Sequence, residues 1–242
     1  MKVDRIRAVA FDLDGTLIDT LPDLTGAVNA MLTALGGHSL PPSRVKDLVG
    51  DGASQLVARA VTESFGTAAP DDGQLATATD LFYRFYAEHL YVHSRVYPDA
   101  VQTLGALADC AFLLCCVTNK ASRFAYPLLD VAGLKDLLRF TLCADRAEQR
   151  KPSPVLLLEA CRRLGVAPDE MLYVGDAHTD VLAARAAGCG AVAVTFGYHR
   201  QGTLEQVKPD ATLGALLEIV TKVLRLPHIT PGASAHLQGV PT

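Results

Sequence analysis

Two aspartates near the N-terminus stand at a spacing that suits catalysis. Asp12 and Asp14 directly follow a short apolar run, residues 9–11, which we expect to be a buried strand. In an extended segment, residues two apart point the same way, so both carboxylates can face one site beyond the strand. Gly15 permits a sharp turn there, because glycine has no side chain to clash at positive φ.

This pair of acids has three interpretations. Two carboxylates this close repel each other, and a hard divalent cation such as Mg²⁺, which prefers oxygen ligands, would offset the repulsion. One carboxylate can instead act as a nucleophile that forms an aspartyl-phosphate, while the other acts as a general acid or base. The plain alternative is an Asp-Gly turn between a strand and a helix.

Polar residues also follow three later apolar runs, and this repetition argues against the plain turn. The runs are residues 112–117, 140–143 and 172–174, and the polar residues that follow them are Thr118, Asn119 and Lys120, then Lys151, then Gly175, Asp176 and Asp180. In doubly wound sheets, ligands bind outside the carboxyl ends of the strands. Carboxylates, a hydroxyl and a lysine at one such edge suit phosphoryl transfer, which requires a nucleophile, a metal and donors around the phosphoryl oxygens.

Each later residue also has a structural interpretation. Thr118 and Asn119 are good helix N-caps. Lys151 can be a solvated loop lysine, and Asp180 can interact with a helix dipole. Their joint occurrence at strand ends favours the functional interpretation.

The second part of the chain alternates between strands and helices. Helical patterns cover residues 99–108, 122–132, 154–164, 179–187 and about 213–224, and a fifth strand is expected at 191–194. This alternation predicts an α/β fold with a Rossmann-like, doubly wound parallel sheet.

Residues 20–95 show only helical patterns, at 22–35, 43–49, 53–64 and 74–91, with a glycine-rich turn at 49–52. We therefore predict an inserted, all-helical cap without a strand. The expected division is a core of residues 1–19 and 96–226 and a cap of residues 20–95. Residues 227–242 are rich in Pro, Gly, Ala and Ser and are expected to be a flexible tail.

Composition narrows the classes of function. The chain has 242 residues, half of them hydrophobic, a net charge of −4 and no run of Lys or Arg, which argues against nucleic acid or an anionic membrane as partner. No apolar stretch approaches the length of a membrane span, and the N-terminus lacks the features of a secretory signal. The six cysteines have no metal-like spacing and are expected to be free core residues in a reducing cytoplasm.

The four motifs together resemble the haloacid dehalogenase superfamily. They are DLDGT at 12–16, TN at 118–119, KP at 151–152 and GDxxxD at 175–180, in that order. The helical insertion and the segments LPDL at 21–24, VGDGA at 49–53, VTNK at 117–120 and KPSP at 151–154 are similar to the phosphoglycolate phosphatase-like branch. Members often have Ser after the fourth-motif Asp, where this chain has Ala177.

The resemblance implies roles for the residues of the core. Asp12 would be the nucleophile, and Asp14 would protonate the leaving group and then activate water. Thr118 and Asn119 would bind the phosphoryl group, and Lys151 would neutralise charge on both Asp12 and that group.

The resemblance also implies a metal site and a substrate loop. Mg²⁺ would be bound by Asp12, Asp176 and the backbone carbonyl of Asp14. Asp180, which shares the fourth motif with Gly175 and Asp176, would support the metal or hold Lys151. The loop of Gly50, Asp51 and Gly52 would close over the site and contact the substrate.

The function that follows from the resemblance is Mg²⁺-dependent hydrolysis of 2-phosphoglycolate to glycolate and phosphate in the cytoplasm, by a monomer or homodimer. The alternatives are a related phosphatase for a sugar phosphate or nucleotide, or a phosphomutase of the β-phosphoglucomutase kind. A catalytically silent binding protein would be expected to lack Asp12, Asp14, Lys151 or Asp176, and all four are present. A haloacid dehalogenase would use the nucleophile without the metal.

Overall fold

A parallel six-stranded sheet forms the centre of the computed structural model, which describes residues 2–66, 68–199 and 202–226. The strand order is β5-β4-β1-β6-β7-β8, and every pairing in this sheet is parallel. The strands are β1 (Ala8–Phe11), β4 (Leu113–Thr118), β5 (Thr141–Cys143), β6 (Met171–Gly175), β7 (Gly190–Val194) and β8 (Ala211–Leu213). The predicted α/β fold class is confirmed.

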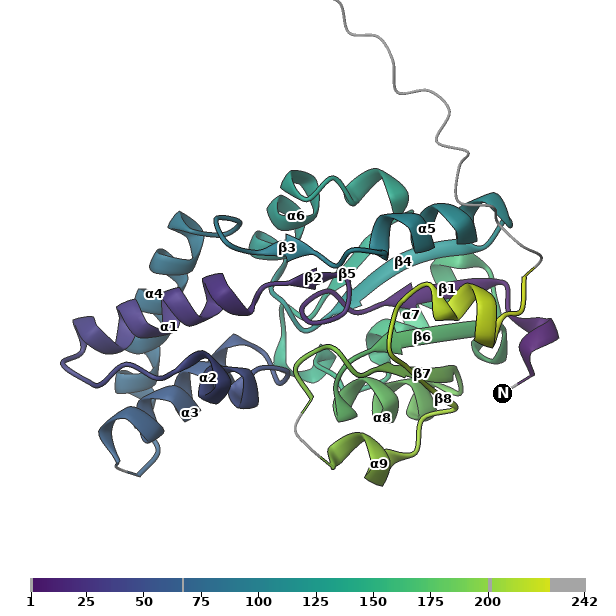
Figure 1. Cartoon of the computed structure of the whole chain (residues 1–242). Coiled ribbons are helices and arrows are strands. Elements are labelled where there is room, and N and C mark those ends of the chain that lie inside the picture. Colours follow the sequence, from purple (N-terminus) through teal and green to yellow (C-terminus); the bar gives the residue numbers. More distant parts are fainter. Residues whose placement is uncertain (1, 67, 200–201, 227–242) are drawn as a thin grey trace, which may run out of the picture.

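The sheet is covered on both faces because its central strand is apolar on both sides. Val9 and Phe11 of β1 pack in one apolar cluster, whereas Ala8 and Ala10 pack in another. The helices α5 (Ala100–Asp109) and α6 (Ser122–Val131) contribute to the first cluster, whereas α7 (Val155–Leu164) and α8 (His178–Ala187) contribute to the second. Figure 1 shows these two helical layers around the sheet.

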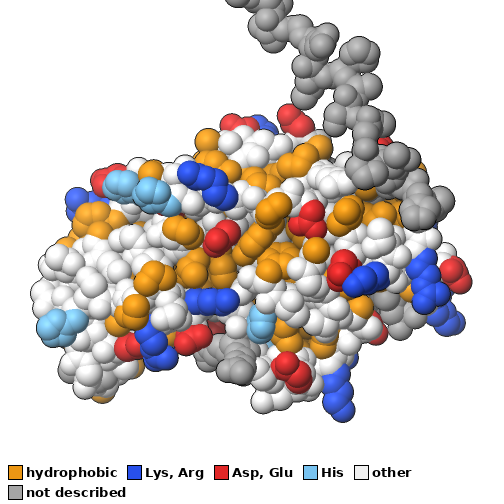
Figure 2. All heavy atoms as spheres, viewed as in Figure 1, with side chains coloured by type: hydrophobic (Ala, Val, Ile, Leu, Met, Phe, Trp, Pro, Cys, Tyr) orange, Lys and Arg blue, Asp and Glu red, His pale blue; other side chains and the backbone are white. Residues whose placement is uncertain are grey.

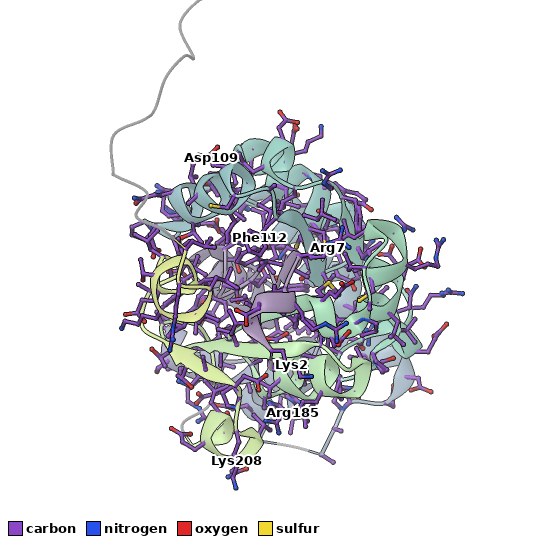
Figure 3. All side chains as sticks on the ribbon, turned by 90° about the vertical axis from the view of Figure 1, so that its right-hand side faces the viewer. Lys2, Arg7, Asp109, Phe112, Arg185 and Lys208 are labelled. Atoms are coloured by element: carbon purple, nitrogen blue, oxygen red, sulfur yellow. The ribbon has the colours of Figure 1, made fainter. Side chains whose placement is uncertain are left out.

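The order of the strands sets the position of the polar residues. β1 pairs with β4 on one side and β6 on the other, so the segments that follow these three strands meet at one edge of the sheet. The opposite edge is seen in Figure 3, where Arg7 and Phe112, which precede β1 and β4, face the viewer.

The inserted helices surround an apolar cluster of their own. They are α1 (Leu21–Ala34), α2 (Pro42–Leu48), α3 (Ala53–Phe65) and α4 (Asp72–Glu88). The cluster includes Met31, Val57 and Phe82, and Phe124 of α6 joins it from the sheet-containing part. Figure 1 shows this helical insertion beside the sheet. Its treatment as a separate cap domain, with the boundaries given above, stays a prediction.

A two-stranded antiparallel ribbon joins the insertion to the rest of the chain. β2 (Ile18–Asp19) pairs with β3 (Arg95–Val96), with Ile18 opposite Val96. The expectation that residues 20–95 contain no strand is therefore wrong at Arg95. Strands of two residues are too short to show an alternating pattern.

The expected helix at about 213–224 is wrong. Residues 211–213 form β8, where Leu213 pairs with Val194, and the helical turns that follow are a short π-helix, η5 (Ile219–Val223). Leu216, Ile219, Val220 and Val223 are buried against the sheet, which explains the apolar spacing that favoured one longer helix.

The remaining elements are short. They are α9 (Thr203–Val207) and the 3₁₀ turns η1 (Val3–Arg5), η2 (Lys135–Leu137), η3 (Ala147–Gln149) and η4 (Pro168–Glu170). The six cysteines are free, as expected. Among the described residues, no helix is both long and apolar enough to cross a membrane. The predicted tail, residues 227–242, lies outside the described residues.

Asp23, in the first turn of α1, holds the chain where it returns from the insertion. Its carboxylate accepts hydrogen bonds from the backbone N–H groups of Val92, His93 and Ser94 and from Ser94 Oγ, at 2.6–3.1 Å. Burial alone would raise the pKa of Asp23, but these hydrogen bonds outweigh it and lower the pKa.

We predict that Asp23→Ala lowers the free energy of unfolding at neutral pH by about 2–3 kcal/mol, because charge-assisted hydrogen bonds are lost. A depressed folded pKa stabilises the protein above the unfolded pKa of about 4, and this contribution is lost as pH falls through the folded pKa. Denaturant unfolding at several pH values measures the difference in free energy of unfolding between the unaltered protein and Asp23→Ala. This difference should be constant above about pH 5 and should shrink below about pH 4. Asp80→Ala, at an exposed position of α4, is the control. An equal loss in both variants, or no change with pH, would contradict the role of Asp23.

Candidate active site

Lys151 is the centre of the charges at the carboxyl edge of the sheet. Its Nζ lies 2.8 Å from Asp12 Oδ1 and 2.6 Å from Asp180 Oδ1, and it donates a 2.8 Å hydrogen bond to the Tyr173 hydroxyl. Tyr173 in turn donates to the carbonyl of Val117. Burial opposes the charge of Lys151, but the two carboxylates outweigh it and raise the pKa of the ammonium. The structure thus places the first, third and fourth motifs in contact.

Asn119 fixes the loop that carries Lys151. Its Oδ1 accepts a 2.8 Å hydrogen bond from the Lys151 N–H, and its Nδ2 donates to the Lys151 carbonyl at 3.3 Å. The peptide bond between Lys151 and Pro152 is cis. The N-cap of α6 is Ala121, so Thr118 and Asn119 are not the caps of that helix. The side chain of Asn119 instead joins the second motif to the third.

Asp12, Asp176 and Asp180 form a buried acidic cluster. One carboxylate oxygen from each lies within 4.8 Å of the others. Burial raises the pKa of Asp12 to about 6, against the opposing effect of Lys151. Burial, together with the charges of Asp180 and Asp12, raises the pKa of Asp176 well above its usual range. Three converging carboxylates with one ammonium leave an excess of negative charge, and an oxygen-rich site of this kind suits a hard divalent cation.

Backbone packs against Asp176 so closely that two glycines are required. A Cβ on Gly15, whose φ is +82°, would lie 2.3 Å from Asp176 Oδ2. A Cβ on Gly197 would lie 2.3 Å from Asp176 Cβ and 2.4 Å from the carbonyl oxygen of Gly15. Gly175 is confined in the same way, since its Cβ would lie 2.3 Å from Asp180 Cγ. Gly197 was not predicted, because the sequence around it has no motif.

Asp14 has a different set of partners from Asp12. Lys120 Nζ donates to its Oδ1 at 2.9 Å and to its Oδ2 at 3.1 Å, and Thr20 Oγ1 donates to Oδ1 at 2.7 Å. The same ammonium donates to the hydroxyl of Tyr86 on α4, at 2.8 Å. The sequence placed Lys120 at a strand end but assigned it no role, and Tyr86 was not predicted at all. Only the fold shows that these residues meet.

Thr118 ends β4 and is 1 % exposed. Its Oγ1 accepts a 3.2 Å hydrogen bond from the N–H of Lys120. Asp180 lies in the first turn of α8, and its Oδ2 accepts a 2.9 Å hydrogen bond from the N–H of Ala177. The carboxylate of Asp180 therefore binds a helix end with one oxygen and Lys151 with the other.

Tyr198 connects the acidic cluster to the start of the insertion. Its N–H donates to Asp176 Oδ2. Its hydroxyl accepts hydrogen bonds from the N–H groups of Thr20 and Leu21 and donates to Asp19 Oδ1 at 2.7 Å. The residue lies just after β7, where the sequence offered no signal for a site residue.

The predicted loop of the insertion lies over the acids, although its three residues differ in position. The carbonyl of Gly50 accepts a 3.0 Å hydrogen bond from Asn119 Nδ2. Gly52, with a φ of +86°, packs near the Arg150 side chain. Asp51 instead forms a 2.6 Å ion pair with Arg59, and it does not line the cavity described next.

A cavity separates the insertion from the carboxyl edge of the sheet. Its polar wall comes from the motifs, and its apolar wall comes mainly from the insertion. It is lined by Asp12, Asp14, Thr118, Asn119, Lys120, Asp176 and Tyr198 on the first wall, and by Leu24, Val49, Leu56, Phe82, Tyr86 and Phe124 among others on the second. On the outer surface, Figure 2 shows hydrophobic side chains in the middle of the face where these two parts meet.

Comparisons with a family model and with known proteins agree on one family. Residues 6–188 match the model of the haloacid dehalogenase-like hydrolases. A phosphoglycolate phosphatase of Chromobacterium violaceum is 43 % identical over 220 residues, which is 90 % of this chain and 97 % of that protein. A phosphoglycolate phosphatase of Nitrosospira multiformis is 41 % identical, over 91 % of this chain and 96 % of that protein.

A solved structure with a similar name also has a similar fold. The crystal structure of a predicted phosphoglycolate phosphatase from Haemophilus somnus superposes with a TM-score of 0.84 at 32 % identity, and covers 90 % of this chain and 97 % of that one.

We predict that Gly197→Ala lowers the free energy of unfolding by about 2 kcal/mol, because the added methyl group overpacks the contact between Asp176 and the Gly15 carbonyl. Gly214→Ala is the matched control, since a Cβ there meets nothing within 4 Å. Thermal or denaturant unfolding of both variants measures the difference. If the two variants are equally stable, the close packing around Asp176 is not a constraint.

Proposed function

Because the chain belongs to the haloacid dehalogenase-like hydrolase family, we propose that it hydrolyses 2-phosphoglycolate to glycolate and phosphate. The two relatives above carry that activity in their names and match nearly the whole chain. The observation that carries the proposal is the separate pairing of two neighbouring acids at one cavity, Asp12 with Lys151 and Asp14 with Lys120. This arrangement provides one carboxylate for attack and another for proton transfer.

In the first step, a carboxylate oxygen of Asp12 attacks phosphorus in line with the ester oxygen. The bond between phosphorus and the ester oxygen breaks, and an aspartyl-phosphate forms. An anion cannot approach a phosphate dianion without neutralisation. Lys151, 2.8 Å from Asp12 Oδ1, is placed to supply part of it. Thr118 and the backbone at Asn119 donate hydrogen bonds to the phosphoryl oxygens.

Asp14 moves the protons of both steps. As the acid, it donates a proton to the departing alkoxide, which leaves as glycolate. As the carboxylate, it then takes a proton from a water molecule whose oxygen attacks phosphorus. The bond from phosphorus to Asp12 breaks, inorganic phosphate is released, and Asp12 is regenerated.

The metal of this proposal is Mg²⁺, held by the carboxylates of Asp12 and Asp176 and by the backbone carbonyl of Asp14. The excess of buried carboxylates described above supports a cation at this place. When bound, the ion neutralises phosphoryl oxygens and orients the phosphate. Asp180 holds Lys151, and Gly175 leaves room for the Asp180 carboxylate.

The loop of Gly50, Asp51 and Gly52 contributes to closure over the substrate. Gly50 and Gly52 line the cavity, and closure would exclude bulk water from the aspartyl-phosphate. A small phosphorylated metabolite as ligand, a cytoplasmic location and a monomer or homodimer belong to the same proposal.

We predict that Asp12→Asn lowers the rate of phosphate release from 2-phosphoglycolate by roughly 10³-fold or more, because the nucleophile is lost. Asp130→Asn, which removes an exposed acid paired with Lys135, should retain activity. Phosphate release is to be compared across 2-phosphoglycolate, hexose phosphates, nucleoside monophosphates and p-nitrophenyl phosphate. Preference for another ester would refute the substrate, and activity in Asp12→Asn would refute the mechanism.

We predict that Mg²⁺ raises the melting temperature of the chelator-treated protein, because an ion that binds only the folded state stabilises it. The rise should be absent in Asp176→Asn, which lacks one of the proposed ligands, and present in Asp130→Asn. Activity should be lost on chelation and return with Mg²⁺. A protein that is fully active after chelation, or an equal rise in Asp176→Asn, would contradict the proposed metal site.

A further inference from the structure

We propose that Lys120 is a positioning residue for Asp14, and that Tyr86 of the helical insertion completes the unit. Asp14 would then be held in its working orientation only while the insertion is seated on the sheet-containing part. The inference rests on the proposed function, which assigns the proton transfers to Asp14.

The contacts of Lys120 leave its ammonium group fully engaged. Its three donors have three acceptors, Asp14 Oδ1 at 2.9 Å, Asp14 Oδ2 at 3.1 Å and the Tyr86 hydroxyl at 2.8 Å. The Lys120 side chain is 5 % exposed. A cation removed from water in this way must be paired and hydrogen-bonded to be tolerated. The carboxylate of Asp14 is therefore fixed through both of its oxygens.

Tyr86 provides a rigid acceptor from the other side of the cavity. It is 1 % exposed. Its ring stacks on Phe82 of the same helix at 5.7 Å between centroids and meets Phe124 of α6 edge-on at 5.2 Å. Lys120 Nζ lies 4.6 Å from the centre of the Tyr86 ring. Because Phe124 belongs to the sheet-containing part, the aromatic contacts that hold the Tyr86 ring come from both parts of the chain.

Asp12 and Asp14 also have different lysine partners. Lys151 contacts Asp12 and Asp180, whereas Lys120 contacts Asp14. Lys120 therefore acts on Asp14 and not on the nucleophile. Loss of Lys120 should impair the step in which Asp14 donates a proton and should leave the attack by Asp12 intact.

The test compares two esters that differ in their need for an acid. The alkoxide of 2-phosphoglycolate must be protonated as it leaves, whereas p-nitrophenolate departs without a proton. Rapid-quench measurement of aspartyl-phosphate formation at saturating ester is made with Lys120→Met, Lys120→Arg and Tyr86→Phe. Tyr83→Phe is the matched control, because it lies on the same helix and its hydroxyl makes no hydrogen bond to any of the described residues.

We expect Lys120→Met to slow the reaction of 2-phosphoglycolate by about 100-fold, the usual scale of a general acid, and that of p-nitrophenyl phosphate by less than about twofold. Tyr86→Phe, which keeps the ring, should slow only the first ester, by roughly fivefold, for the loss of one hydrogen bond. Lys120→Arg should recover part of the rate, because a guanidinium can also bind a carboxylate through two oxygens. Tyr83→Phe should match the unaltered protein.

Several results would overturn the inference. Equal slowing of both esters would indicate a structural or phosphate-binding role for Lys120. A loss of folding in Tyr86→Phe, measured by circular dichroism, would indicate a structural role for Tyr86. A higher KM for 2-phosphoglycolate with an unchanged kcat would assign Lys120 to the carboxylate of the substrate. If the unaltered protein does not hydrolyse 2-phosphoglycolate, the proposed substrate fails. The comparison then proceeds with another alkyl phosphate and still decides the role of Lys120.

Discussion

Repulsion between buried carboxylates is the constraint on which the rest of the structure depends. Asp12, Asp176 and Asp180 lie within a few ångströms of one another at the carboxyl edge of the sheet. Such a cluster is costly unless positive charge is fixed beside it. Lys151 supplies part of that charge, and its position is itself secured by Asn119 and Tyr173. The glycines at 15, 175 and 197 then let the backbone approach close enough to hold the acids in place.

The site therefore has two cationic centres rather than one. Lys151 serves the cluster that includes Asp12, and Lys120 serves Asp14, with the aromatic group of Phe82, Tyr86 and Phe124 behind it. Asp12 and Asp14 are only two residues apart, and yet their carboxylates pair with different lysines. The proposed mechanism gives these two acids different tasks, which require different surroundings, and this separation provides them.

Much of this arrangement could be predicted from the sequence, because it follows from local patterns. Continuous apolar runs predicted the central strands. Asp12, Asp14, Thr118 and Asp176 were found among the polar residues close after these runs, and Lys151 was found in the segment that follows the run at 140–143. The roles assigned to these residues stay proposals. Tyr86, Gly197 and Tyr198 could not be predicted, because each gains its importance from a contact with a residue distant in sequence. The strand β8 was missed, and its last residue, Leu213, was assigned to a helix, because three residues are too few to show a period and the buried side chains after it repeat at helical spacing.

The ribbon of β2 and β3 has a consequence for how this protein can change over evolution. The chain enters and leaves the helical insertion through one short ladder, with Ile18 opposite Val96. The six strands of the sheet and their register do not depend on the length of what lies between those two points. A different block of helices can be exchanged at this junction while the acids and lysines at the strand ends keep their positions. Substrate choice can therefore diverge among descendants without reinventing the chemistry, provided that each new block again supplies a partner for Lys120.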